Sequence, residues 1–315
     1  MNILFCIEKY CDGKSEMGLS NNQHNLLGSL KHSLNINFNV VYYDEIFQKH
    51  NKHIDDLLPK ICERNKTDIV IFSLMNNYAG SPTIKTFELL KKMNIKTCIH
   101  WPDTGLDWGY PQIEQMNEKF VDIHIGWDNA DSEFHKTRKI PNNFLQLFVP
   151  QDPHLYYKDK EQEIPISFVG SLHMQERQIF LDHAINKNGL PIIVHGGQRK
   201  EKLTHEQYAK LIRNSKISIN FPFCNGGFDQ AKGRIYEVLA SCSMLLERKN
   251  NATNKIFKPG YDYVEYDSPD DFVEKIKYYL NNDTERSKIA EQGYNTYNKK
   301  YNAKCFWEIV LNKMK

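Results

Sequence analysis

The sequence predicts an α/β protein made of two doubly wound, Rossmann-like domains. The chain has 315 residues, which exceeds the usual size of one domain. Short β-branched runs alternate with helical patterns, as is typical of parallel sheets covered by helices. The alternation stops over residues 149–165, a charged and proline-bounded segment, and then restarts. We therefore expect an N-terminal domain over residues 1–150 and a C-terminal domain over residues 164–301.

The first domain should hold six strands, with helices in the intervals. Ser20 marks the clearest helix start, because Gln23 completes a capping box ahead of a run of leucines. The loop of residues 8–19 contains two glycines, so a mobile lip over a cleft and plain disorder both fit. The predicted strands are residues 3–7, 38–43, 69–74, 96–100, 122–126 and 144–148.

The second domain should hold five strands, followed by a wholly helical tail. Ser268 and Pro269 predict a helix start, with Asp270 and Asp271 in the first turn, where the helix dipole favours acids. The last helix, residues 302–315, is amphipathic, and we expect it to pack back on the first domain. The predicted strands are residues 166–169, 192–195, 217–221, 244–247 and 263–266.

Composition excludes several classes of protein. The 41 basic and 39 acidic side chains leave a net charge of +2, so no chain-wide basic field favours nucleic acid or membrane. Seven cysteines form no CxxC pair, the N-terminus lacks the pattern of a signal peptide, and no apolar run approaches a membrane span of about 20 residues. We expect a soluble cytoplasmic protein.

Familiar cofactor and metal motifs are also missing. The sequence contains no GxGxxG, no GxxxxGK[ST], no HExxH and no Cys/His cluster. We therefore expect neither a dinucleotide cofactor nor a dedicated metal site.

The strongest candidate site lies in residues 220–247. A predicted strand leads into a glycine-bearing loop and then a helix over about residues 230–241, and the free N–H groups of a helix start bind anions, usually phosphate. Asp229 and Glu237 are separated by seven residues, with Lys232 and Arg234 between them. The simpler alternative is a surface pair between Arg234 and Glu237, three residues apart on one helix.

Further candidates follow other strands, because ligands of open α/β sheets bind beyond the carboxyl ends. In the second domain these loops offer a close approach to phosphate or a base, although tight turns explain them equally well; the residues are Gly170, Ser171, Arg177, His195 and Gly196. In the first domain His100 and Asp103 suit proton transfer or hydroxyl binding, and Trp101 and Trp108 suit a sugar or base. Alternatively, the tryptophans belong to the core and His100 is a satisfied buried histidine.

The second half resembles a known family. The segment FVGS, the acid pair and the wording KGRIYEVLASCSMLLE are similar to retaining group 1 glycosyltransferases of the GT-B fold, specifically the CgeB-like (spore maturation protein) branch. The resemblance covers about residues 166–301 and is weak over the first half, which in this family serves the acceptor. It implies two Rossmann-like domains that face a central cleft.

The resemblance also implies residue roles. Glu237 would hold the ribose of a nucleotide sugar, and Asp229, where the family usually has glutamate, would face the donor sugar. His100 and Asp103 would contact acceptor or sugar, so His100, Asp103 and Asp229 are our predicted catalytic residues. Backbone N–H groups of Asn225, Gly226, Gly227 and Phe228 would approach the diphosphate or sugar, and Lys232, Arg234 or Arg177 would neutralise the diphosphate.

The implied function is transfer of a sugar from a nucleotide-diphosphate sugar, with UDP favoured, to an acceptor hydroxyl, with retention and without metal. The acceptor could be a glycan, a small molecule, a protein or modified DNA. Two alternatives remain. A transferase acting on hydroxymethylated DNA would show DNA binding that depends steeply on salt. A non-catalytic nucleotide-sugar-binding module would bind nucleotide without transfer.

Overall fold

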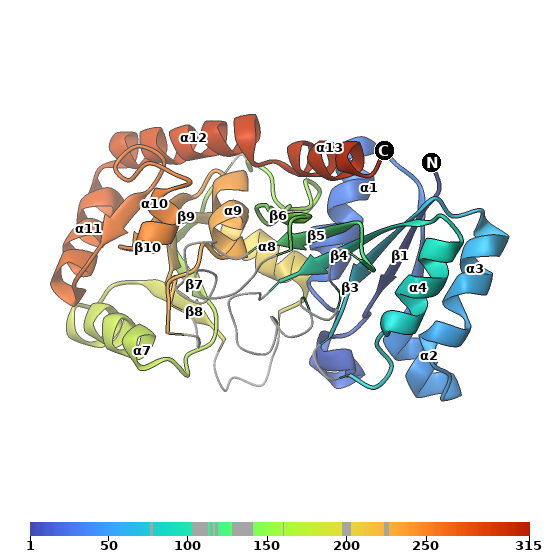
Figure 1. Ribbon diagram of the computed structural model, residues 1–315. Coiled ribbons are helices and arrows are strands. Elements are labelled where there is room, and N and C mark those ends of the chain that lie inside the picture. Colours follow the sequence, from blue (N-terminus) through green and yellow to red (C-terminus); the bar gives the residue numbers. More distant parts are fainter. Residues whose placement is uncertain are drawn as a thin grey trace. The chain divides into compact units, whose positions relative to one another are not determined.

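The computed structural model describes residues 1–75, 78–102, 113, 116, 119–127, 141–159, 161–196, 203–223 and 227–315. It divides into two compact units (Figure 1). The first unit contains Met1–Val149 together with Ala303–Lys315, and the second contains Pro150–Asn302. Each unit has its own parallel sheet with helices packed against it.

The sheet of the first unit has six parallel strands in the order β2-β1-β3-β4-β5-β6. The strand order reverses between β1 and β3, which makes the carboxyl ends of these two strands the switch point of this sheet. The strands are β1 (Ile3–Ile7), β2 (Phe38–Tyr42), β3 (Ile69–Ser73), β4 (Lys96–Trp101), β5 (Ile123–Gly126) and β6 (Phe144–Gln146).

Helices flank this sheet. The α-helices are α1 (Ser29–Leu34), α2 (Tyr43–His50), α3 (Leu58–Asn65), α4 (Ile84–Lys92) and α13 (Ala303–Lys313). The remaining turns are η1 (Cys11–Gly13), η2 (Ser15–Met17) and η4 (Ile54–Asp56), which are 3₁₀-helices, and η3 (Gln23–Gly28), a π-helix.

The C-terminal helix α13 is part of the first unit and lies beside α1 (Figure 1). Trp307 Nε1 donates a hydrogen bond to Ser29 Oγ at 2.8 Å. Its ring meets Phe5 of β1 edge to face, with centroids 6.0 Å apart. The fully buried indole therefore satisfies its one polar atom while its apolar area stabilises the unit.

The sheet of the second unit has five parallel strands in the order β11-β10-β9-β7-β8, with its switch point between β7 and β9. The strands are β7 (Ile164–Val169), β8 (Ile192–His195), β9 (Ser215–Asn220), β10 (Met244–Arg248) and β11 (Val264–Tyr266). The helices are α7 (Gln175–Asp182), η5 (His183–Lys187, a π-helix), α8 (His205–Arg213), α9 (Gly233–Ala240), α10 (Asn251–Asn254), α11 (Pro269–Asn281) and α12 (Asp283–Lys300).

The predicted fold class is confirmed, and the eleven predicted strands coincide with β1 to β11 to within a few residues. The predicted start of α11 is also confirmed: the helix begins at Pro269, and Ser268 Oγ accepts from the N–H of Asp271 at 3.1 Å. No helix in the described part of the chain combines the length and apolar character needed to cross a membrane.

The predicted start of α9 is wrong. Helix α9 begins at Gly233 rather than near residue 230, because Lys232 is extended and Asp229 forms an antiparallel bridge with Phe223. Asp229 is therefore not at the helix start.

The predicted helix start at Ser20 is confirmed. Ser20 Oγ accepts from the N–H of Asn22 at 3.2 Å, and helical residues follow from Asn22. The capping box with Gln23 is wrong, because the N–H of Ser20 donates to the Lys9 carbonyl at 2.9 Å and Gln23 Nε2 donates to the Glu8 carbonyl at 3.3 Å. Ser20 Oγ also donates to the buried Glu8 carboxylate at 2.6 Å.

Candidate functional site

The loops that follow β7 and β8 touch through two glycines. Gly170 N–H donates to the carbonyl of His195 at 2.8 Å. Gly196 has φ +121°, and a Cβ built on it would lie 2.0 Å from the Gly170 carbonyl oxygen. These two glycines were predicted to let a ligand approach the backbone closely. In the structure they let the two loops approach each other.

Next to this contact, the loop after β7 is fixed by its own side chains. Ser171 Oγ is hydrogen bonded to His173 Nδ1, and Arg177 Nη1 of α7 donates to the Ser171 carbonyl at 2.9 Å. Burial, and then the positive charge of Arg234, lower the pKa of Arg177. Two guanidinium groups therefore share the carboxyl edge of β7.

Arg234, in the first turn of α9, is held on one side only. Its Nε donates to the Tyr208 hydroxyl at 3.1 Å, and its guanidinium carbon lies 5.8 Å from the ring centroids of both Phe168 and Tyr208. Its terminal nitrogens make no hydrogen bond with any described residue, and Nη1 lies 3.2 Å from a Cβ built on Gly170. The result is an oriented cation whose donor-bearing end is unpaired.

Glu237 lies one turn further along α9 and is 8% exposed. The Tyr208 hydroxyl donates to its Oε2 at 2.5 Å, whereas Oε1 has no hydrogen bond within the described residues. Burial raises the pKa of Glu237, and Arg234 and Tyr208 oppose that rise. The alternative of a direct Arg234–Glu237 pair is wrong, because the phenol stands between the two charges.

Tyr208 was missed from the sequence, although a signal was available. Thr204 and Gln207 form a capping box that fixes the start of α8, with Gln207 N–H on Thr204 Oγ1 at 3.2 Å. Such a box places Tyr208 in the first turn of the helix after β8, at the same edge as the other site residues. Residues 205–213 carry no unusual motif, so no pattern in the sequence marks this helix as part of a binding site.

The glycine-bearing loop after β9 gives a mixed result. Lys232 Nζ donates to the carbonyls of Phe221 and Phe223, at 2.9 and 2.7 Å, so it holds the loop. Asp229 is exposed; its pKa is raised by partial burial and then by the Glu176 carboxylate. Gly227 has φ +76° with open space around it, and Phe228 is partly exposed. The predicted residues Asn225 and Gly226 lie outside the described residues.

Asn220 and Glu247 are register partners at the ends of β9 and β10, and both are fully buried. Glu247 Oε1 accepts from Asn250 at 3.2 Å and from Thr253 at 3.3 Å. Glu247 Oε2 and both polar side-chain atoms of Asn220 have no partner among the described residues. Burial raises the pKa of Glu247 to about 8, so this carboxyl is largely neutral at pH 7. No sequence feature distinguished either residue.

At the switch point of the first unit, a closed polar network joins β1 to β3. Asn22 Nδ2 donates to Glu8 Oε1 at 2.6 Å and to Ser73 Oγ at 2.8 Å, and Ser20 also donates to Glu8. The loop of residues 8–19 is ordered by η1, η2 and a bridge between Tyr10 and Leu19. The expectation of a disordered or mobile lip is therefore wrong.

His100 ends β4 and is 1% exposed, with neither ring nitrogen partnered by a described residue. Its ring lies 3.6 Å from that of Trp127, and burial lowers its pKa to about 3, so the imidazole is neutral. Trp101 belongs to the core, where its Nε1 donates to His124 Nδ1 at 3.0 Å. The core alternative is thus correct for Trp101. Asp103 and Trp108 lie outside the described residues.

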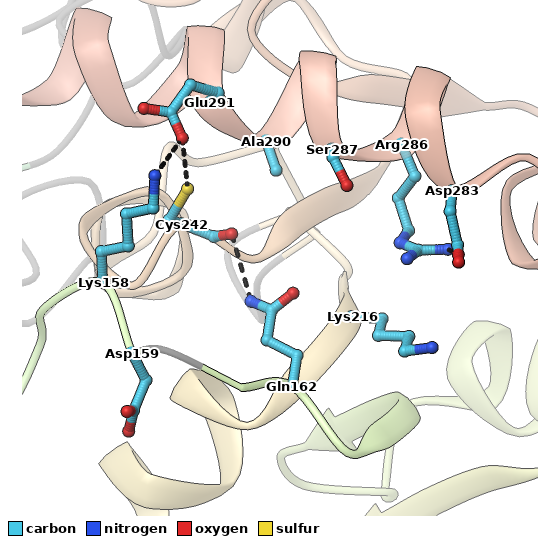
Figure 2. A pocket seen from close by; sticks show the side chains of 10 residues that line it. All are labelled: Lys158, Asp159, Gln162, Lys216, Cys242, Asp283, Arg286, Ser287, Ala290 and Glu291. Carbon is cyan, nitrogen blue, oxygen red and sulfur yellow. Dashed lines mark hydrogen bonds and ion pairs between the residues drawn. The ribbon is translucent and has the colours of Figure 1, made fainter.

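A cavity of about 380 Å³ opens at the opposite, amino edge of the second sheet (Figure 2). The residues that line it include three cations and three acids. Glu291 receives Lys158 Nζ at 2.5 Å and the Cys242 thiol at 3.4 Å. The ten lining residues are Lys158, Asp159, Gln162, Lys216, Cys242, Asp283, Arg286, Ser287, Ala290 and Glu291. Within the described residues, no cluster of His, Cys, Asp and Glu could hold a metal ion.

The comparisons with known proteins agree with this architecture. A family model described as "Glycosyl transferase-like" matches residues 176–311. No curated protein sequence matches the chain.

Solved structures resemble the chain over its full length. Anabaena HepE, solved with UDP and glucose, has a TM-score of 0.65 and 11% identity, over 100% of this chain and 99% of that one. A Rickettsia africae glycosyltransferase has a TM-score of 0.63 and 12% identity, over 100% and 97%. Sucrose-phosphate synthase from Thermosynechococcus elongatus has a TM-score of 0.60 and 9% identity, over 99% and 98%. The two parallel α/β units of the chain therefore share the GT-B fold of these solved structures, and residues 176–311 match the glycosyl transferase-like family model.

Proposed function

We propose that the chain transfers a sugar from a UDP-sugar to an acceptor hydroxyl, with retention of configuration. The observation that carries the proposal is Arg234, an oriented cation whose terminal nitrogens have no partner among the described residues and which lies beside a second cation, Arg177. Two like charges at one sheet edge repel each other unless an anion lies between or beside them. A diphosphate is such an anion, and the N-terminus of α9 adds free N–H groups at the same edge.

The contacts favour Arg234 as the main ligand of the diphosphate. Lys232 already donates hydrogen bonds to two backbone carbonyls, and one nitrogen of Arg177 donates to the Ser171 carbonyl. Glu237 keeps one oxygen without a hydrogen bond and can accept from a ribose hydroxyl. Uracil is the proposed base because HepE, which shares the fold, was solved with UDP and with UDP-glucose.

Transfer requires stabilisation of the leaving group and placement of the acceptor. As the bond from the anomeric carbon to the diphosphate oxygen breaks, negative charge grows on the diphosphate, and preorganised cations stabilise it without a metal. The neutral His100, with two unpartnered nitrogens, suits hydrogen bonding to a hydroxyl of the acceptor or donor sugar. Asp229 is proposed to contact the donor sugar, and no residue is assigned as a nucleophile.

The metal-free mechanism and the compartment are also proposals. Chelation with EDTA should leave turnover unchanged, and loss of turnover that Mg²⁺ or Mn²⁺ restores would contradict a metal-free reaction. Free thiols in the six described cysteines support a reducing, cytoplasmic setting.

Calorimetry with UDP and GDP, followed by a transfer assay with UDP-sugars and a panel of acceptors, tests the function. We expect UDP to bind, and the Glu237→Ala variant to keep its fold while losing donor turnover and most nucleotide affinity. Unchanged turnover in that variant would overturn the role of Glu237. Nucleotide binding without transfer to any acceptor would instead indicate a binding module.

A further inference from the structure

A single phenol joins the two charged groups of the proposed nucleotide site. The Tyr208 hydroxyl accepts from Arg234 Nε at 3.1 Å and donates to Glu237 Oε2 at 2.5 Å. The phenol comes from α8, whereas both charged residues belong to α9. Both hydrogen bonds involve an ionised partner, which makes them stronger than neutral ones.

We propose that Tyr208 is a positioning residue that keeps Arg234 and Glu237 apart and aims their free ends at the two halves of one nucleotide. This inference rests on the proposed function, in which Arg234 binds the diphosphate and Glu237 the ribose. The phenol itself need not touch the ligand.

The spacing on α9 explains why such a residue is needed. Arg234 and Glu237 are three residues apart, so their side chains are neighbours on the helix surface and would otherwise pair directly. A direct pair would consume the guanidinium nitrogens and the carboxylate oxygen that the ligand requires. With the phenol between them, Arg234 uses only Nε and Glu237 uses only Oε2 in the hydrogen bonds to Tyr208. The terminal nitrogens of Arg234 and Oε1 of Glu237 stay available.

The electrostatic surroundings of Glu237 give the proposal a ligand-free readout. The titratable groups near its carboxylate are Arg234 on α9, Tyr208 on α8 and Tyr156 from the segment before β7. Burial raises the pKa of Tyr208; the charge of Arg234 opposes that rise and the charge of Glu237 adds to it, so the phenol stays neutral and able to donate. Because its hydrogen bond lowers the pKa of Glu237, removing the hydroxyl should make Glu237 take up a proton at higher pH.

The test compares Tyr208→Phe with Tyr278→Phe, a control at an exposed tyrosine on α11. UDP and 2′-deoxy-UDP are titrated by calorimetry from about pH 5 to pH 8, and the Glu237 carboxyl is titrated by ¹³C NMR without ligand. For Tyr208→Phe we expect the Kd of UDP to rise about 10- to 100-fold, as for loss of a charge-assisted hydrogen bond. The preference for UDP over 2′-deoxy-UDP should shrink, and the Glu237 titration should move to higher pH. The control should match the wild type.

The outcomes separate this inference from the function beneath it. If wild-type protein binds UDP and Tyr208→Phe binds it equally well, with an unmoved Glu237 titration, the positioning role is wrong while the function stands. If wild-type protein binds no nucleoside diphosphate, both fail. Should Tyr208→Phe not fold, Arg234→Lys provides the second test, because lysine keeps the charge but has no Nε to place on the phenol. It should show the same loss of UDP affinity, and unchanged affinity would overturn the proposal.

Discussion

The two switch points share a topology but differ in their polar chemistry. Between β1 and β3, Glu8, Asn22 and Ser73 form a network that satisfies its members from within the unit. Between β7 and β9, Arg234 is oriented, and its terminal nitrogens make no hydrogen bond with a described residue. Proteins rarely leave buried or oriented polar groups without partners, so we propose that this second switch point is the one that binds a ligand.

The first unit has its own unsatisfied group, one strand away from its switch point. Ser73 on β3 and His100 on β4 are register partners. Ser73 is bonded into the network, whereas neither ring nitrogen of His100 has a partner among the described residues. In the first unit, therefore, a fixed group and a group without a described partner lie on adjacent strands.

The largest expected effect comes from filling the glycine contact of the second unit. In Gly196→Ala, the new Cβ would meet the Gly170 carbonyl oxygen at 2.0 Å in a left-handed backbone conformation. Strain and overpacking together should cost about 3–5 kcal/mol of unfolding free energy. Gly189→Ala is the matched control, since Gly189 has φ +65° but open space, so only the backbone strain of about 1 kcal/mol applies. Urea unfolding measures both, and equal losses would show that the loop contact is not tight.

The second prediction concerns pH. The pKa of Glu247 in the folded state is about 8, against 4.5 for an ordinary glutamate, so the folded state holds an extra proton between those values. Its contribution to stability is complete below about pH 4.5 and is lost as pH rises toward 8, by about 5 kcal/mol at most. Glu247→Gln should flatten this fall in urea unfolding series from about pH 5 to pH 9. Glu285→Gln, at an exposed position, should leave the fall of unfolding free energy with pH unchanged. If Glu247→Gln shows the same fall as the wild type, the raised pKa of Glu247 is refuted.

The third prediction tests the unpaired cation. Arg234→Gln removes the charge from the edge of β7 but leaves a side chain of similar reach, so UDP affinity should fall by about 2–3 kcal/mol, roughly 30- to 150-fold. Lys216→Gln removes a cation from the cavity at the opposite edge of the same sheet. Calorimetry should find UDP affinity unchanged in that control, and a similar loss in both variants would point to general electrostatics.

The smallest effect is expected at the closed switch point. In Glu8→Gln, the amide oxygen can still accept from Ser20 and Asn22, but the amide NH₂ group replaces Oε2, which accepts from the Tyr43 hydroxyl at 3.4 Å in the wild type. The mismatch should cost about 1–2 kcal/mol in thermal or urea unfolding. UDP affinity should not change, because the network belongs to the other unit. Glu16→Gln, at an exposed site in the same loop, serves as control, and a loss of UDP binding in Glu8→Gln would break the contrast between the two switch points.

Prediction from sequence was strong for strands and weak for side-chain partners. Strand Ile3–Ile7 was located to the residue, because a buried parallel strand reads as an uninterrupted apolar segment. The half-exposed edge strand Ile192–His195 was also located to the residue, from its β-branched run. The start of α9 was misplaced by three residues, because an antiparallel bridge at Asp229 replaced the first helical turn. Tyr208 was missed because nothing local marks a tyrosine as the partner of residues 26 and 29 positions away.

The sequence by itself determined the fold class, the strand-loop-helix unit around Glu237 and its mixture of cations and acids. These follow from local periodicity and from residue types at fixed spacing, which short-range physics controls. Only the tertiary structure decided that Lys232 is occupied, that Arg234 is free and that Glu237 is held by Tyr208. Such distinctions depend on which groups from distant helices and loops lie within hydrogen-bonding distance, and a linear pattern carries no information about that distance.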